Sequence, residues 1–395
     1  MTTSPTHHFT LSDQSRLDAL RLSRVAGVGP INFCKLLCQY GSPANALKAL
    51  PERMKRAGRL ENPTIPPQSD IEKEIEQLHH LGGQMLIRGD DDYPHLLSLI
   101  PDAPPVLFVK GNLSKLSMRS IGIVGARNAS AAGIRIAESI SAELSHEGIC
   151  VVSGLARGID SAAHEAALFS NLTVAAIAGG LDTTYPFENA KLQEKISENG
   201  CLITEAPMGT IPQARHFPRR NRLIAGLSLG CLVIEATLHS GTLITADLAA
   251  SYNRELFSVP GSPLDPRSRG SNNLIRNGAI LTESIQDILP YLPSQLPPKM
   301  AAPWQNSVVF NNSTSGFSEP IMTWNSIQTF TPEDPSLMLE NVQSLLSITP
   351  VTVDEVVQRC QFSVSAVLSI LAELELGGVV EFVPGGRVAL LPNRN

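Results

Sequence analysis

The chain contains little cysteine, and its cysteines do not have the spacing of a redox or metal motif. It has six cysteines among 395 residues, none of them in a CxxC pair, and Cys150 and Cys231 lie inside apolar runs. Such positions are typical of buried, reduced thiols in a cytosolic protein. The sequence therefore predicts neither a disulfide framework nor a zinc site.

The sequence also lacks long apolar runs and an excess of positive charge. No run approaches the roughly 20 apolar residues of a membrane span, and the N-terminus has no basic segment followed by an apolar core. We therefore expect no membrane span, no signal peptide and a cytoplasmic location. The 31 basic and 37 acidic residues give a formal net charge of −6, so any nucleic-acid site has to be a local basic patch.

The length of 395 residues and the hydrophobic fraction of 43% predict two or three domains. Residues 1–65 are predicted to form a helical module similar to a SAM domain or a helix-hairpin-helix, with a tight turn at Gly27, Gly29 and Pro30. Backbone N–H groups at such a turn can hold a phosphate. Few basic residues flank this turn, so a plain packed helical hairpin is the favoured interpretation.

The segment 70–290 alternates short apolar runs with helix-length amphipathic segments. The apolar runs are SIGIVGA (120–126), GICVVSGLA (148–156), LTVAAIAGG (172–180), GCLITEAP (200–207), GCLVIEAT (230–237) and ELFSVPG (255–261). This alternation predicts an α/β domain with an extended, Rossmann-like, doubly wound and mostly parallel sheet. Ligands of such sheets bind at the carboxyl ends of the strands.

The C-terminal part is predicted to contain a linker and a small domain. Residues 291–335 are rich in Pro, Ser and Asn and read as a flexible linker. Residues 336–395 give two helices and a hairpin at Gly385 and Gly386, the pattern of a winged helix. This domain carries six acidic residues against three arginines, and its segment 363–376 has no basic residue. We therefore expect a poor duplex binder and a protein-interaction or regulatory module.

The first two strand ends argue against a nicotinamide cofactor. The first strand is followed by GIVGARNASAAG, which lacks the GxGxxG spacing. An NAD-binding fold needs an acidic residue at the end of the second strand, to hold the ribose hydroxyls. Here Ser153 and Gly154 stand at that point and Arg157 follows. Positive charge in this place indicates a phosphate-bearing ligand, and no cofactor is predicted.

Four glycine-rich strand ends and the arginine-rich stretch HFPRRNRLIAGLS (216–228) predict one continuous basic groove. Its residues are Ser153, Gly154, Arg157, Gly158, Gly179, Gly180, Asp182, Tyr185, Asn189, Arg219, Arg220, Arg222, Ser240, Gly241 and Thr242. The residues alone leave open whether the ligand is a nucleotide or a polynucleotide. Tyr185, Phe187 and Phe217 are available for stacking and favour a single strand. Asp160 and His164, four residues apart on one helix, are predicted to fix each other or a backbone loop.

These motifs resemble those of the DNA-processing protein family DprA, also called Smf. The strings that carry the resemblance are VGARNASAAG, SGLARGIDSAAH, GGLDTTYPFEN, FPRRNRLIAGLS, SGTLITA, VPG and GSNNLIRNGA. The resemblance is close over about 75–290 and looser over both flanking modules. It implies a bacterial cytoplasmic homodimer that binds single-stranded DNA and loads the RecA recombinase in natural transformation. It implies no cofactor and no established catalytic activity.

By motif position, the resemblance adds residues to the predicted groove. Gly125, Arg127 and Ser130 are placed in a phosphate pocket of the first turn, and Asn221 and Phe217 in the basic stretch. The other predicted groove residues fall in the family's remaining loops.

The competing hypothesis is an enzyme that acts on a nucleotide, such as a phosphoribohydrolase of the lysine-decarboxylase-like Rossmann group. Those enzymes use the string PGGxGTxxE, with a catalytic Glu close after the glycines. Here HSGTLITADL has Leu, Ile and Thr in that window, and its first acid is Asp247. This argues against hydrolysis. A pure scaffold would leave the arginines of the groove unexplained.

Overall fold

The computed structural model describes residues 13–56, 64–238, 240–297, 339, 342–343, 345–347, 350–360, 364–383 and 386–391. The chain divides into two compact units, Met1–Arg24 with Ile65–Ala302 and Val25–Thr64 with Pro303–Asn395, called unit 1 and unit 2 here. The predicted linker lies outside the described residues from 298 onward, and so does Gly385 of the predicted hairpin.

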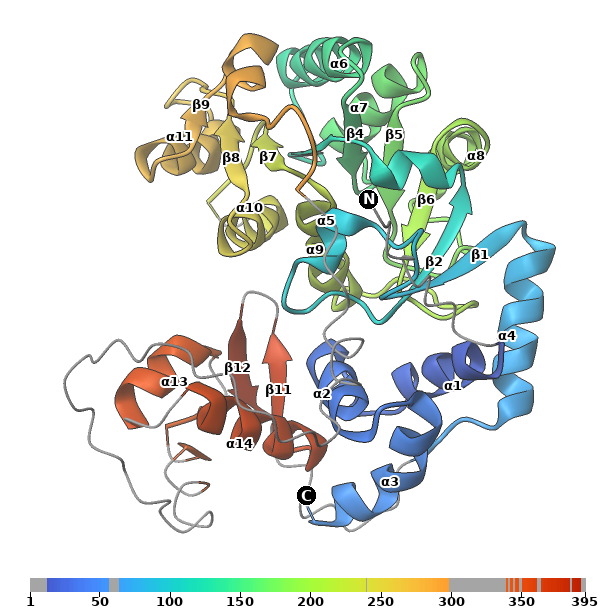
Figure 1. Ribbon diagram of the computed structural model, residues 1–395. Coiled ribbons are helices and arrows are strands. Elements are labelled where there is room, and N and C mark those ends of the chain that lie inside the picture. The colour runs from blue at the N-terminus through green and yellow to red at the C-terminus, as the bar shows by residue number, and fades with distance from the viewer. Residues whose placement is uncertain are drawn as a thin grey trace, which may run out of the picture. The chain divides into compact units, whose positions relative to one another are not determined.

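Unit 1 is built on a nine-stranded sheet of order β1-β2-β6-β5-β4-β3-β7-β8-β9 (Figure 1). The strands are β1 (Gly83–Ile87), β2 (Val106–Gly111), β3 (Ser120–Val124), β4 (Cys150–Ser153), β5 (Thr173–Ala176), β6 (Cys201–Thr204), β7 (Gly230–Val233), β8 (Glu255–Ser258) and β9 (Ile280–Leu281). Strands β3 to β9 pair in parallel. All six predicted apolar runs form strands, which confirms the predicted fold class. The chain before them adds β1 and β2 in antiparallel pairing at the edge beside β6.

Helices cover both faces of the sheet in unit 1. They are α1 (Asp13–Ser23), α4 (Gln68–His80), α5 (His95–Ser98), α6 (Ala131–His146), α7 (Ile159–Leu168), α8 (Ala190–Asn199), α9 (His216–Leu227), α10 (Gly241–Ser251) and α11 (Arg269–Arg276). Alternate strand residues pack to opposite sides: Val151 packs with residues of α6 and α7, whereas Val152 packs with residues of α5, α9 and α10. This is the period-two pattern of a sheet that is buried on both faces.

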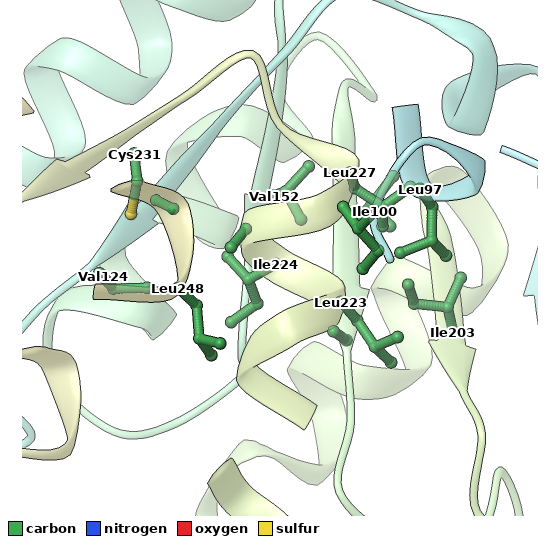
Figure 2. Close-up of a cluster of buried hydrophobic side chains, with 14 of the residues drawn as sticks. Leu97, Ile100, Val124, Val152, Ile203, Leu223, Ile224, Leu227, Cys231 and Leu248 are labelled. Atoms are coloured by element: carbon green, nitrogen blue, oxygen red, sulfur yellow. The ribbon is translucent and has the colours of Figure 1, made fainter. Parts of the chain in front are cut away.

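Helix α9 joins the arginine-rich stretch to the core. Its C-terminal half is apolar, and Leu223, Ile224 and Leu227 are at most 3% exposed. Figure 2 shows them among side chains of α5, β4 and β6. Burying each such side chain contributes roughly 1.5–3 kcal/mol, so the position of α9 is firmly set. A Cβ at Gly226 would lie 2.8 Å from Leu97, so glycine lets α5 pack closely.

Unit 2 contains a small three-stranded sheet of order β10-β12-β11 with antiparallel pairing. Its elements are α2 (Pro30–Tyr40), α3 (Pro43–Arg56), β10 (Val351–Thr352), α13 (Val353–Cys360), α14 (Val364–Leu376), β11 (Val380–Val383) and β12 (Arg387–Leu390). The two C-terminal helices and the sheet share a core that includes Val356, Val367 and Leu371. This arrangement confirms the predicted winged helix. In neither unit is any helix of the described residues long and apolar enough to cross a membrane.

Candidate functional site

A pocket of about 370 Å³ lies at the carboxyl ends of β4 and β5. We call it the arginine pocket. It is lined by Arg127, Gly154, Leu155, Ala156, Arg157, Ile177, Ala178, Gly179, Thr183, Thr184, Tyr185, Pro186, Phe187, Glu188, Pro212, Phe217 and Arg220. Of the predicted groove residues, Arg127, Gly154, Arg157, Gly179, Tyr185, Phe217 and Arg220 are brought together here.

Two of the arginines contact the same aromatic ring. The guanidinium carbons of Arg127 and Arg220 lie 5.1 Å and 5.9 Å from the centroid of the Phe217 ring. The Tyr185 ring packs on the same residue, with 5.6 Å between the ring centroids. Cation–π contacts of this kind hold an arginine in place without neutralising it. The positive charge therefore stays available to a ligand.

Arg220 is buried in the wall of the pocket. It is 5% exposed, and its Nε is buried without a hydrogen-bond partner. A Cβ on Gly154 would lie 1.2 Å from its Nη1, so only glycine leaves room for this guanidinium. Burial lowers the pKa of Arg220 to about 10, although the nearby Asp160 carboxylate opposes that shift. Arg220 thus remains charged at neutral pH and has unused capacity to donate to an anion.

Three polar side chains, those of Asp160, Asn189 and His164, form hydrogen bonds to the backbone of the loop 154–157. Asp160 accepts hydrogen bonds from the backbone N–H groups of Gly154 (3.2 Å) and Ala156 (3.4 Å). The amide of Asn189 donates to the carbonyl of Leu155 at 2.9 Å. Leu155 has a φ of 55°, a left-handed conformation that is uncommon for a branched side chain. These bonds fix the conformation that presents Arg157 at the rim.

His164 completes this support as a neutral imidazole. Its Nε2 accepts from the backbone N–H of Leu155 at 3.3 Å, and its Nδ1 lies 2.7 Å from the hydroxyl oxygen of Thr173. The Thr173 hydroxyl donates to the carbonyl of Val151, so Nδ1 carries the proton and donates to Thr173. Burial, assisted by Arg220, lowers the pKa of His164 to about 3.

We expect this histidine to make the protein less stable as the pH falls below its unfolded-state pKa of 6.5. Between pH 6.5 and the folded-state pKa near 3, His164 is protonated in the unfolded chain and neutral in the folded chain. One such proton changes the free energy of unfolding by about 1.4 kcal/mol per pH unit. Urea denaturation of the wild type and of His164→Asn between pH 7.5 and 4.5 measures this effect. The difference in free energy of unfolding between the two proteins should shrink by roughly that slope as the pH falls. A constant difference would contradict the assignment of His164 as a neutral side chain in the folded protein.

Several predicted groove residues lie outside the arginine pocket and stabilise the loops around it. Ser153 is fully buried and donates from its hydroxyl to the carbonyl of Ile123 at 2.6 Å. Gly158 has a φ of 75°, and a Cβ there would lie 2.3 Å from the carbonyl oxygen of Ala126. Asp182 accepts from the backbone N–H of Gly209 at 2.8 Å. These residues shape the loops and do not offer free groups to a ligand.

The fourth predicted loop is fixed to the first turn. The Thr242 hydroxyl donates to the carbonyl of Gly125 at 3.1 Å, and Ser240 caps α10 by accepting from the backbone N–H of Thr242 at 3.1 Å. Asn221 donates to the carbonyl of Gly241 at 3.4 Å. Ser240, Gly241 and Thr242 therefore brace the loop of Arg127. A Cβ on Gly125 would lie 2.5 Å from Ile159, and one on Gly180 would lie 2.4 Å from Asp182, so both glycines serve packing.

The arginines of the stretch 216–228 do not form one surface, contrary to the sequence prediction. Arg220 lines the pocket, whereas Arg219 is exposed and is not among the lining residues. Arg222 is 3% exposed and pairs with the carboxylates of Glu205 and Asp102. Successive residues of an α-helix are rotated by about 100°, so these neighbours in sequence point in different directions. Arg222 is part of a buried ion-pair network and does not face the pocket.

Ser130 likewise differs from its predicted role. Its hydroxyl caps α6 by accepting from the backbone N–H of Gly133 at 2.9 Å, and it also donates to the carboxylate of Glu235. The family resemblance implied a phosphate at Ser130, and the sequence analysis did not identify Glu235. The available signal was an acidic residue two positions after the end of the buried strand β7. Leu155, Thr183, Thr184, Glu188 and Pro212 were also missed. The first four lie inside the quoted motifs SGLARGIDSAAH and GGLDTTYPFEN, but these strings do not show which of their residues line the pocket.

Among the described residues, no group of three or more His, Cys, Asp and Glu side chains could hold a metal ion. The six cysteines are free thiols, and burial raises the pKa of Cys150 to about 12. The arginine pocket offers guanidinium groups, aromatic rings, threonine hydroxyls and backbone groups, together with one carboxylate, Glu188, whose Oε1 lies 3.8 Å from Nη1 of Arg157.

Three family models match this chain. Residues 84–293 match DNA recombination-mediator protein A, residues 13–76 match the DprA-like N-terminal HHH domain, and residues 328–386 match the DprA winged helix domain. The chain is 34% identical to a protein Smf of Synechocystis, covering 93% of this chain and 97% of that protein. It is 37% identical to the protein Smf of Escherichia coli, covering 82% of each chain.

Two solved structures are similar. One is the X-ray structure of DNA processing protein A from Streptococcus pneumoniae, with a TM-score of 0.62 and 35% identity, covering 72% of this chain and 99% of that one. The other is the structure of DNA processing protein A from Helicobacter pylori, reported for its single-stranded DNA binding mode. It has a TM-score of 0.50 and 29% identity and covers 53% of this chain and 95% of that one.

Proposed function

Since the chain belongs to the DprA (Smf) family of DNA recombination-mediator proteins, we propose that it binds single-stranded DNA in the arginine pocket and across its rim. The observation that carries this proposal is Arg220. Its buried guanidinium lines the pocket beside Arg127 and Arg157 and keeps its charge at neutral pH, and a charged donor held in such a wall favours an anionic ligand. A phosphate of a nucleic-acid backbone supplies that anion.

The aromatic residues of the rim favour a single strand over a duplex. Tyr185 is 47% exposed and Phe187 is 84% exposed, so both rings present area on which an unstacked base can lie. Base–aromatic stacking contributes about 1–3 kcal/mol per base and needs no particular sequence. In a duplex the base faces are covered by their neighbours. The single-strand binding described for the Helicobacter pylori protein supports the same choice.

We extend the proposal, on family membership, to recombination. The protein would act without a cofactor and without catalysis, as a cytoplasmic homodimer that helps load RecA onto incoming single strands. The helical module at 1–65, the DNA-binding domain at 70–290 and the acidic winged helix at 336–395 would be separate functional parts. The last would contact a protein and not a duplex.

An enzymatic function has weaker support. The carboxylate that lines the pocket, Glu188, pairs with Arg157 at 3.8 Å. Asp160 is engaged by two backbone N–H groups, and His164 is held as a neutral support. A phosphoribohydrolase would need a free carboxylate beside the sugar. Incubation with nucleoside monophosphates and assay for free base would reveal such an activity.

The proposal is tested by fluorescence anisotropy with a labelled single-stranded oligonucleotide at two salt concentrations. We expect tight binding that weakens at higher salt, because each neutralised phosphate releases bound counterions. An unlabelled duplex of the same sequence should compete poorly. Absence of binding at both salt concentrations, or equal competition by the duplex, would refute the proposal.

A further inference from the structure

Glu235 lies where a doubly wound sheet usually binds its ligand. Strands β3 and β7 are neighbours, and the strand order runs outward from them in opposite directions, so this pair is the topological switch point. Rossmann-type sheets bind nucleotide phosphates at this point, on the N-terminus of the helix that follows the first strand. In this chain that helix is α6, and Glu235 is the second residue after the end of β7.

The carboxylate of Glu235 occupies the N-terminus of α6. Its Oε2 accepts a hydrogen bond from the backbone N–H of Ser130 at 2.9 Å, and its Oε1 accepts from the Ser130 hydroxyl. A Cβ on Gly133 would lie 2.7 Å from the carboxylate carbon, so glycine in the first turn of α6 leaves room for this group. We call this place, formed by Ser130 and Gly133, the α6 anion position. A negative charge from the chain itself fills it.

The backbone around Glu235 is built to hold this arrangement. Glu235 has a φ of 98°, a conformation that non-glycine residues rarely adopt. The next residue is fixed as well, because the carbonyl of Ala236 accepts from the backbone N–H of Gly270 at 2.7 Å. The chain thus retains an unfavourable backbone conformation at Glu235, whose carboxylate contacts the N-cap residue of α6.

We infer that Glu235 is a specificity-determining residue that closes the α6 anion position to nucleotide phosphates. A free mononucleotide or dinucleotide that approached this helix would meet a carboxylate in place of open N–H groups, and the like charges would repel. Three arginines, Arg127, Arg157 and Arg220, line the arginine pocket at the carboxyl ends of β4 and β5, away from the α6 anion position. The positive charge that could bind phosphate therefore lies away from the switch point. This placement favours a nucleic-acid strand that crosses the edge of the sheet. Only this last step rests on the proposed single-strand binding.

The test is titration of the full chain with inorganic pyrophosphate by isothermal calorimetry, with and without saturating oligothymidylate to fill the arginine pocket. Glu235→Gly removes the carboxylate and tolerates the positive φ. We expect this variant to gain a pyrophosphate site that the oligonucleotide does not displace, about tenfold or more tighter than any residual wild-type binding. Glu235→Gln keeps the position filled and should gain no such site.

Two controls separate this inference from stability and from the proposed function. Glu235→Asn also tolerates a positive φ but is one methylene shorter, and it replaces the glycine variant if that does not fold. Glu255→Gln, an exposed residue at the start of β8, should behave like the wild type. A folded Glu235→Gly or Glu235→Asn without added pyrophosphate binding would overturn the inference, as would an undisplaced site in the wild type. Failure of the oligonucleotide itself to bind would instead count against the proposed function.

Discussion

Arg220→Ala is expected to weaken single-strand binding by about tenfold to a hundredfold, the loss of one charge-assisted phosphate contact in a partly desolvated pocket. The side chain is buried against Gly154 and Phe217, so it loses little conformational freedom when an anion arrives. The slope of log affinity against log salt should fall by about 0.7, the contribution of one phosphate on a single strand. Anisotropy titrations at four salt concentrations measure both quantities.

Arg219 provides the matched control for this experiment. It precedes Arg220 on α9, carries the same charge and is exposed, yet it does not line the arginine pocket. Arg219→Ala should change the affinity less than about threefold, the effect expected of a screened surface charge. Arg220→Lys should recover only part of the loss, because a lysine cannot reproduce the planar group above Gly154. Equal losses for both alanine variants would show that general charge, and not the pocket, drives binding.

The sheet could be predicted from the sequence because its central strands are locally encoded. Each of the six apolar runs is short, β-branched and bounded by glycine-containing turns, and each forms a strand at the predicted place. Strands β1 and β2 lie outside the six predicted runs. Their place depends on antiparallel pairing between β2 and β6, nearly a hundred residues apart in sequence. Local periodicity carries no information on such a partner.

The candidate site was predictable to a different extent. The glycine-rich loops were found because strand ends meet at one edge of a parallel sheet. The direction of each side chain could not be predicted from the sequence, because α9 directs Arg220 toward the pocket and Arg222 into the interior. The sequence shows positive charge at a helix start but not the acids that neutralise it. The acids that pair with Arg222, Glu205 and Asp102, come from other segments of the chain. Glu235, which accepts a hydrogen bond from the Ser130 hydroxyl, also comes from another segment.

Arg222→Ala is therefore expected to affect stability and not DNA binding. Arg222 is buried between Glu205 and Asp102, and Asp102 also accepts from the Tyr252 hydroxyl at 2.7 Å. Burial alone would lower the pKa of Arg222, but the two carboxylates outweigh it and raise that pKa. Removing the cation leaves two acids together in a mostly buried site. Breaking such a pair costs about 3–5 kcal/mol, and we expect about 3 kcal/mol here because the acids are 17% and 23% exposed.

Urea denaturation followed by circular dichroism measures this loss, and titration of the remaining folded protein with the oligonucleotide measures binding. Adding Glu205→Gln to Arg222→Ala should restore part of the stability, because it removes one of the two acids that lost their partner. The affinity should stay within about twofold of the wild type, since a cation enclosed by carboxylates cannot also bind a phosphate. A tenfold weaker affinity with unchanged stability would place Arg222 in contact with DNA and contradict this geometry. Two arginines separated by one residue would then share the role that we propose for Arg220.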